Sequence, residues 1–158
     1  MTVLPVECVQ DYPRPPAIEP VALRLRVEVA GVTLADSEAA FRVLETHHSP
    51  SYYIPQSDIL MSLLVPSSRQ TFCEWKGRAA YFDIVVNGKR RRNAGWCYPA
   101  PTARFDALKD HISFYAGSVD AAWVGDLKVA AQPGDFYGGW VTPNLSGRIK
   151  GLPGTTHW

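Results

Sequence analysis

The clearest signal in the chain is an alternation of apolar and polar positions at a period of two. From Leu23 to Val29, apolar residues alternate with arginine and glutamate, which predicts a half-buried strand. A short turn then leads into a second predicted strand over 32–35. Ala79–Val86 and Lys89–Tyr98 flank Asn87-Gly88, a dipeptide that favours the type I′ turn of a β-hairpin. These segments together predict a mainly β domain.

Weaker patterns lie between the predicted strands. Residues 37–45 fit a short helix by propensity and a strand by alternation, and the sequence leaves both open. The apolar pieces 52–54 and 59–65 each end at a proline and fit either a short strand or one helical turn. Residues 67–70 are polar and are expected to form a loop.

The second half of the chain contains one predicted helix and more strand-like residues. Thr102 is expected to cap a short helix over 103–110. Strand-like residues follow at 111–115 and 121–129, and Gly125 indicates a tight turn within the second of these.

Proline and glycine set off both ends of the chain. Five prolines within residues 1–22 predict an extended N-terminal arm ahead of a β domain over 23–131. Residues 132–158 form a tail rich in glycine and proline that still carries large aromatic residues: Phe136, Tyr137, Trp140 and Trp158. Because such side chains are rarely left in water, we expect the tail to pack on the domain or to hold a homodimer together.

Composition and charge limit the classes of binding partner to expect. Apolar residues make up 46% of the chain, and the formal net charge of +1 gives no overall field for nucleic acid or an anionic membrane. The basic run Lys89–Arg92 follows the predicted turn and is expected to be a solvated hairpin tip. No membrane span or signal peptide is apparent, and the three cysteines form no CxxC pair. We therefore expect a cytoplasmic protein with reduced thiols that binds neither nucleic acid nor membrane.

Three short segments carry candidate chemistry. Glu45, His48 and Tyr53 bring a carboxylate, an imidazole and a phenol close together in the sequence, which suits acid–base work or hydrogen bonding to a ligand. The plainer interpretation is a glutamate that bonds backbone amides at a bend while the tyrosine packs. Spacing alone does not aim these groups at a common point.

The second segment places Cys73 near Lys76, and the third ends a strand with Trp96 and Tyr98. A lysine can lower the pKa of a nearby thiol and so favour the nucleophilic thiolate, although a buried cysteine also serves as a small apolar residue. The aromatic residues suit the wall of a pocket for a planar ligand or the filling of a core.

Several motifs in order resemble one family of domains. They are Glu45-Thr46 with His48, Pro50, Tyr52-Tyr53 and Pro55; Cys73-x-x-Lys76-Gly77 with Ala79 and Tyr81; Asn93-Ala94; Trp96-x-Tyr98-x-x-Pro101; and Phe114-Tyr115. This pattern, over roughly residues 25–130, resembles the domain-of-unknown-function family number 427. The resemblance implies a β-tent, in which small antiparallel sheets lean together, similar to the fold of methionine sulfoxide reductase B.

Two properties of related proteins do not carry over to this chain. The paired CxxC zinc ligands are absent, so no structural zinc is expected. A nucleotidyltransferase label is sometimes used for the family, but the chain has no Gly-Ser segment followed by a DxD pair to hold a metal and a triphosphate. We expect no cofactor.

The sequence therefore predicts a small-molecule-binding domain, either a simple binder or an enzyme. Cys73 is the candidate nucleophile with His48 or Glu45 as its base, and the ligand would be held by the residues Tyr53, Lys76, Trp96 and Tyr98. The alternative is a noncatalytic interaction module that uses the aromatic tail. The first hypothesis requires that all seven side chains share one concave site.

Overall fold

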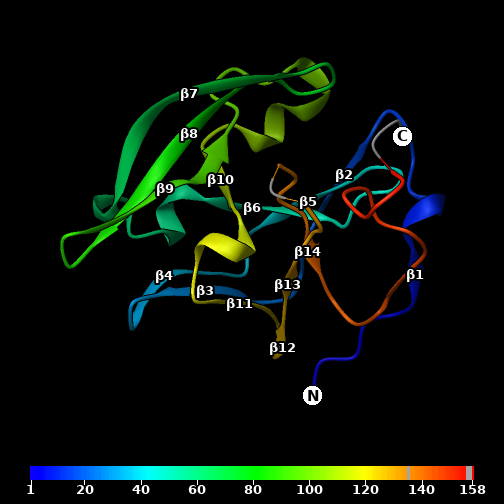
Figure 1. The fold of residues 1–158 in the computed structure, drawn as a ribbon, viewed down its shortest axis with the longest axis horizontal. Coiled ribbons are helices and arrows are strands. Elements are labelled where there is room, and N and C mark those ends of the chain that lie inside the picture. The colour runs from blue at the N-terminus through cyan, green and yellow to red at the C-terminus, as the bar shows by residue number, and fades with distance from the viewer. Residues whose placement is uncertain (135, 156–157) are drawn as a thin grey trace.

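The computed structural model describes residues 1–134, 136–155 and 158, and it is built from antiparallel sheets (Figure 1). The larger sheet has seven strands in the spatial order β2 (Ala17–Pro20), β5 (Phe41–Leu44), β6 (Ser51–Pro55), β10 (His111–Phe114), β9 (Lys89–Cys97), β8 (Gly77–Val86) and β7 (Leu64–Cys73). The smaller sheet has four strands in the order β12 (Leu127–Lys128), β11 (Ala121–Val124), β3 (Leu25–Val29) and β4 (Val32–Ser37). The mainly β prediction is confirmed.

Short elements complete the described part of the chain. Two further pairs of strands form, one parallel, β1 (Glu7–Cys8) with β15 (Leu145–Ser146), and one antiparallel, β13 (Ala130–Ala131) with β14 (Trp140–Val141). The helical segments are single 3₁₀ turns or little more: η1 (Val9–Asp11), η2 (Gln56–Asp58), η3 (Met61–Leu63), η4 (Ala103–Leu108) and η5 (Ala116–Ser118). No helix of the described residues is both long enough and apolar enough to cross a membrane.

Both predicted hairpins are present, and both turns use positive φ angles. Asn87 and Gly88 have φ angles of 53° and 75°, which allow the tight connection between β8 and β9. Ala30 and Gly31 have φ angles of 50° and 77° between β3 and β4. Residues 37–45, which the sequence left open, contain the strand β5.

Two local predictions are wrong. The expected polar loop at 67–70 lies within β7, where a register shift after Pro66 breaks the pairing with β8. A proline is tolerated there because β7 is the edge strand of its sheet. Thr102 does not cap a helix through its side chain; its hydroxyl donates instead to the carbonyl of Trp75, and the segment after it is the 3₁₀ helix η4.

The N-terminal segment contributes to the structure more than an arm would. Residues 17–20 form the edge strand β2 and pair with β5, and the side chain of Val9 is fully buried. The prolines limit pairing to one side of this strand, which suits an edge position.

Alternation along the strands of the larger sheet separates two apolar clusters. On one face, residues such as Tyr52, Cys97 and Phe114 pack against the smaller sheet and form the main core. On the opposite face, Tyr53, Trp96 and other large rings form a second cluster. Adjacent residues therefore serve different clusters, as the period of two requires.

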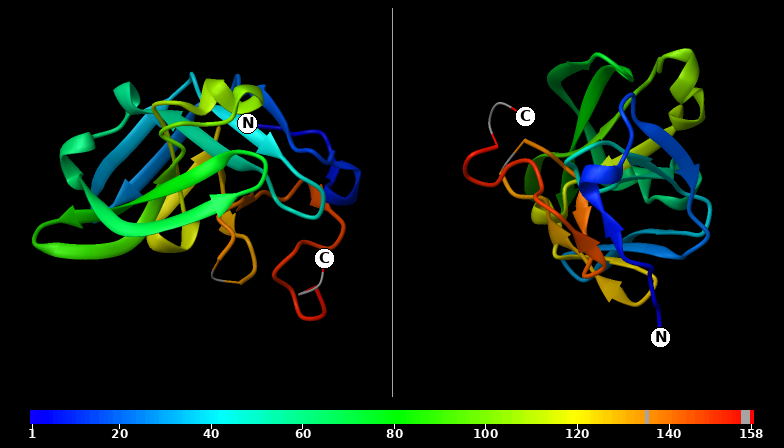
Figure 2. Two further views of the ribbon diagram at one scale, coloured as in Figure 1. Left: turned by 90° about the horizontal axis from the view of Figure 1, so that it is seen from above. Right: turned by 90° about the vertical axis from the view of Figure 1, so that its right-hand side faces the viewer.

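The C-terminal segment runs back along the domain. Figure 2 shows it, coloured orange to red, beside the blue N-terminal segment, in agreement with the pairing of β1 with β15. Trp140 is fully buried, and its indole N–H donates to the carbonyl of Phe114 at 2.8 Å. This tryptophan fastens the segment to the main core.

Candidate functional site

A cavity of about 240 Å³ lies on the face of the larger sheet that carries the second aromatic cluster. All seven residues singled out from the sequence line it: Glu45, His48, Tyr53, Cys73, Lys76, Trp96 and Tyr98. The structure thus brings them together, and none of them lies elsewhere. Their chemical roles remain predictions.

Strand alternation and two turns explain this convergence. Tyr53 and Trp96 point to the cavity side from the strands β6 and β9, while their neighbours Tyr52 and Cys97 point into the main core. Glu45 directly follows β5, and Cys73 ends β7 at the turn into β8. Because the cavity is lined from both β5 and β7, which lie near opposite ends of the strand order, the larger sheet must curve around it.

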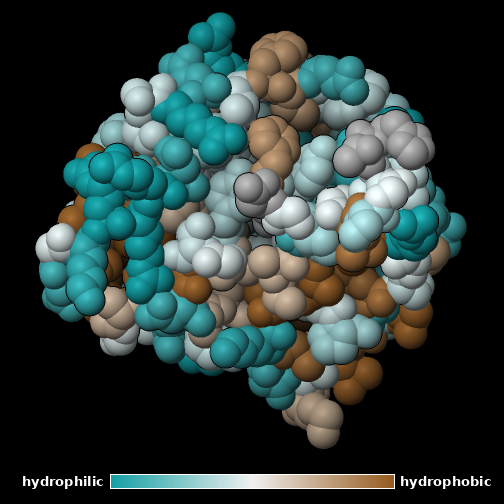
Figure 3. Space-filling view, in the orientation of Figure 1, coloured by the Kyte–Doolittle hydropathy of each residue, from teal (hydrophilic) through white to brown (hydrophobic). Residues whose placement is uncertain are grey.

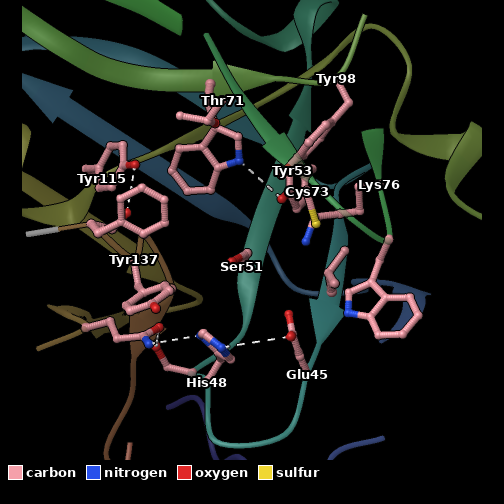
Figure 4. A pocket seen from close by; sticks show the side chains of 18 of the residues that line it. Glu45, His48, Ser51, Tyr53, Thr71, Cys73, Lys76, Tyr98, Tyr115 and Tyr137 are labelled. Atoms are coloured by element: carbon pink, nitrogen blue, oxygen red, sulfur yellow. Dashed lines mark hydrogen bonds and ion pairs between the residues drawn. The ribbon is translucent and has the colours of Figure 1, made fainter. Parts of the chain in front are cut away.

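Lys76 provides a buried positive charge. Its residue is only 8% exposed, and no carboxylate of the described residues lies within 4.0 Å of its Nζ atom. Burial acts to lower the pKa of Lys76, but the acidic groups of Tyr53, Cys73 and Glu45 outweigh it, so the pKa lies above the usual value. The side chain is therefore an ammonium group that no carboxylate of the described residues pairs with closely. Figure 4 shows it beside Cys73 and below Tyr53.

Glu45 and His48 form a second polar group in the cavity (Figure 4). His48 Nε2 lies 4.0 Å from Glu45 Oε2, too far for a hydrogen bond. Burial lowers the pKa of His48 to about 4, and the positive charges of Lys150 and Lys76 add to the effect. The imidazole is therefore neutral at pH 7.

The hydrogen bonds of Gln132 determine which nitrogen of His48 carries the proton. Gln132 is 2% exposed; its Nε2 lies 3.0 Å from the Lys150 carbonyl, and its Oε1 accepts from the Ser49 hydroxyl. A carbonyl only accepts, so the amide orientation is fixed. The same Nε2 lies 3.2 Å from His48 Nδ1 and must donate to it. The proton of the neutral ring therefore sits on Nε2, the atom that faces Glu45.

Aromatic rings enclose the rest of the cavity. The Trp96 ring lies 4.7 Å from that of Tyr115 and meets Tyr53 edge-on at 6.1 Å, while its indole N–H donates to the Tyr53 hydroxyl at 3.3 Å. Burial raises the pKa of Tyr53 and Tyr98, so both phenols stay protonated at neutral pH. The cavity thus combines flat apolar surfaces with neutral hydroxyl groups.

The tail closes one side of the cavity, which the sequence analysis did not anticipate. A Cβ at Gly138 would overlap the Trp96 ring, and a Cβ at Gly139 would overlap the backbone and side chain of Ser49. Two consecutive glycines before Trp140 were the available signal, because they allow close approach of a backbone. Neither Gln132 nor this role of the glycines was identified from the sequence.

The remaining candidates are accounted for as follows. All three cysteines are free; Cys97 packs on the core side, where burial raises its thiol pKa to about 11, while Cys73 faces the cavity. Among the described residues, no group of three His, Cys, Asp or Glu side chains is placed to hold a metal ion. In the basic run, Arg90 pairs with Asp83 and Arg91 with Asp120. Hydrophilic side chains surround this hairpin tip at the left of Figure 3.

Comparison with known proteins gave one match, to a protein family. No curated protein matches the chain. A family model described as a domain of unknown function, DUF427, matches residues 17–125, a range that starts at β2 and ends before Gln132 and the rest of the tail. The match covers more than half of the chain, the seven predicted site residues included, and the chain therefore belongs to the DUF427 family.

Proposed function

We propose that this cavity binds a small ligand with a planar body and an anionic group. The single observation that carries the proposal is the ammonium group of Lys76, which is almost fully buried and lies within 4.0 Å of no carboxylate of the described residues. The nearby Tyr98 ring stabilises this charge in part, but a buried charge that no close carboxylate neutralises is still costly, and a bound anion would reduce that cost. The positive charges of Lys150 and Lys76, which add to the effect of burial on the pKa of His48, favour the same kind of ligand.

The walls and size of the cavity define the rest of the ligand. Trp96, Tyr115 and Tyr53 offer ring surfaces on which a flat apolar body can stack. The volume of about 240 Å³ is below the range of about 300–1,000 Å³ that is typical of sites for drug-sized molecules. A single-ring carboxylate such as benzoate is a suitable probe.

Calorimetric titration tests the proposal with three probes that differ in charge: benzoate, benzamide and benzylamine. We expect benzoate to bind at least about tenfold more tightly than the other two, since hydrogen bonds to charged groups contribute more than neutral ones. Lys76→Met should remove this preference, whereas the exposed Lys89→Met control at the hairpin tip should retain it. Equal binding of benzoate and benzamide, or an unchanged benzoate affinity in Lys76→Met, would refute the proposal.

An enzymatic form of the proposal uses Cys73 as a nucleophile. This thiol lines the cavity together with Lys76. Glu45 suits the role of base better than His48, because the Nδ1 lone pair of His48 is already used by Gln132. Free cysteines also fit the reducing environment of the cytosol, where we propose that the protein acts.

The alternative function, an interaction module, is favoured by one observation. Phe72 is 78% exposed and Phe136 is 51% exposed, although both border the cavity, and exposed aromatic side chains are enriched at protein interfaces. Other tail aromatics are engaged within the chain, such as the buried Trp140. Light scattering of the full chain at rising concentration tests this alternative, and a constant monomer mass would contradict a homodimer.

A further inference from the structure

We infer that the cavity selects planar anions that also carry a hydroxyl group, and that Gln132 is a positioning residue that makes His48 a hydrogen-bond donor to that hydroxyl. This inference rests on the proposed function and extends it to a narrower class of ligand. It uses two features of the cavity that do not involve Lys76: the gap between His48 and Glu45, and the hydrogen bonds of the buried amide of Gln132.

The gap between the two side chains has the size of one bridging atom. His48 Nε2 and Glu45 Oε2 are 4.0 Å apart, and the carboxylate oxygens of Glu45 accept no hydrogen bond from the described residues. If an oxygen lay about 2.8 Å from each atom, the Nε2–O–Oε2 angle at that oxygen would be about 90°. This angle suits a group that accepts one hydrogen bond and donates another. A single polar group of a ligand can therefore join the pair.

The fixed tautomer of His48 determines what that group must be. Nε2 carries the proton and donates, while the Glu45 carboxylate accepts. A hydroxyl satisfies both, because it accepts from the imidazole and donates to the carboxylate. An ether or a ketone has no proton for Glu45, and an ammonium group has no lone pair for His48. Without the Gln132 bond the ring could adopt the other tautomer, and the discrimination would be lost.

The position of the pair within the cavity sets the shape of the ligand. Figure 4 shows Glu45 and His48 on one side of the cavity and Lys76 with Tyr53 on another. A cavity of about 150 Å³ can hold a benzene ring, so about 240 Å³ has room for a ring with an anionic group and a hydroxyl at separate positions. Hydroxybenzoates are the simplest molecules of this class.

The test compares 3- and 4-hydroxybenzoate with benzoate and with the matching methoxybenzoates by calorimetric titration. The better hydroxybenzoate should bind at least about tenfold more tightly than benzoate and than its methoxy counterpart, as expected for a hydroxyl bonded to a carboxylate. His48→Leu should abolish this preference. His48→Gln retains an amide N–H near the position of Nε2 and should recover part of the preference.

Nitrogen NMR of protein labelled at histidine gives a readout that a purely structural role of Gln132 would not move. The couplings of the ring nitrogens should show the proton of His48 on Nε2 in the wild-type chain and a mixture of tautomers in Gln132→Met. A proton on Nδ1 in the wild-type protein would overturn the role of Gln132 without any variant having to fold.

The outcomes separate this inference from the proposed function. If benzoate binds in a Lys76-dependent manner and the hydroxyl gives no gain, the inference fails and the proposed function stands. If no carboxylate probe binds, or none depends on Lys76, the proposed function fails as well. A hydroxyl preference that persists in His48→Leu would also overturn the inference.

Discussion

Acid should destabilise the folded protein through His48 well before most carboxylates are protonated. The folded-state pKa of His48 is about 4, against an unperturbed value of 6.5, because the ring is buried and lies near two lysines. A proton therefore binds more tightly to the unfolded chain. The stabilisation is fully present above pH 6.5 and is lost as the pH falls toward 4.

The magnitude follows from the difference between the two pKa values. Each unit corresponds to about 1.4 kcal/mol, so the shift represents about 3 kcal/mol in total, of which about 2 kcal/mol is lost between pH 7 and pH 5. Burial of the ring is the main cause. A proton on Nδ1 would in addition face the donating amide of Gln132 and break their hydrogen bond.

Urea unfolding of the wild-type chain and of His48→Gln at pH 7 and at pH 5 measures this loss of stability. Other titrating groups are common to the two proteins and cancel in the difference between their free energies of unfolding. We expect the wild-type chain to lose about 2 kcal/mol more than His48→Gln between pH 7 and pH 5. His111→Gln, outside the cavity, serves as the control and should behave like the wild-type chain. Parallel losses in the wild-type chain and His48→Gln would refute the reasoning.

Two further predictions concern the walls of the cavity. Gly139→Ala would press a Cβ against Ser49, so we expect the free energy of unfolding in urea to fall by about 1–3 kcal/mol and benzoate to bind more weakly. Gly117→Ala is the control, because its Cβ would meet only Ala131, at 3.8 Å. Equal effects of the two substitutions would contradict this account. Iodoacetamide should alkylate Cys73 faster than the buried Cys97, and benzoate should slow the reaction at Cys73 while leaving Cys8 unaffected. Alkylation of Cys73 at the same rate with saturating benzoate would contradict the placement of the ligand.

The sequence by itself determined the local structure where one side-chain pattern allowed one conformation. Asn87-Gly88 has a strong preference for a tight turn, and the alternation in Leu25–Val29 fits only a strand with one buried face, so both were predicted correctly. Residues 67–70 were not, since pairing with β8 overrides their polar composition. Secondary structure that depends on a partner strand is not encoded in the segment alone.

The composition of the site was also present in the sequence, but its arrangement was not. Glu45, Cys73 and Trp96 stand out by residue type, whereas only the curvature of the larger sheet makes them neighbours. The roles of Gln132 and of the Gly138-Gly139 backbone depend on contacts with Ser49, His48 and Trp96, which lie far away along the chain. Hydrogen-bond direction, burial and the tautomer of a histidine are properties of such long-range contacts, and for that reason only the tertiary structure decided them.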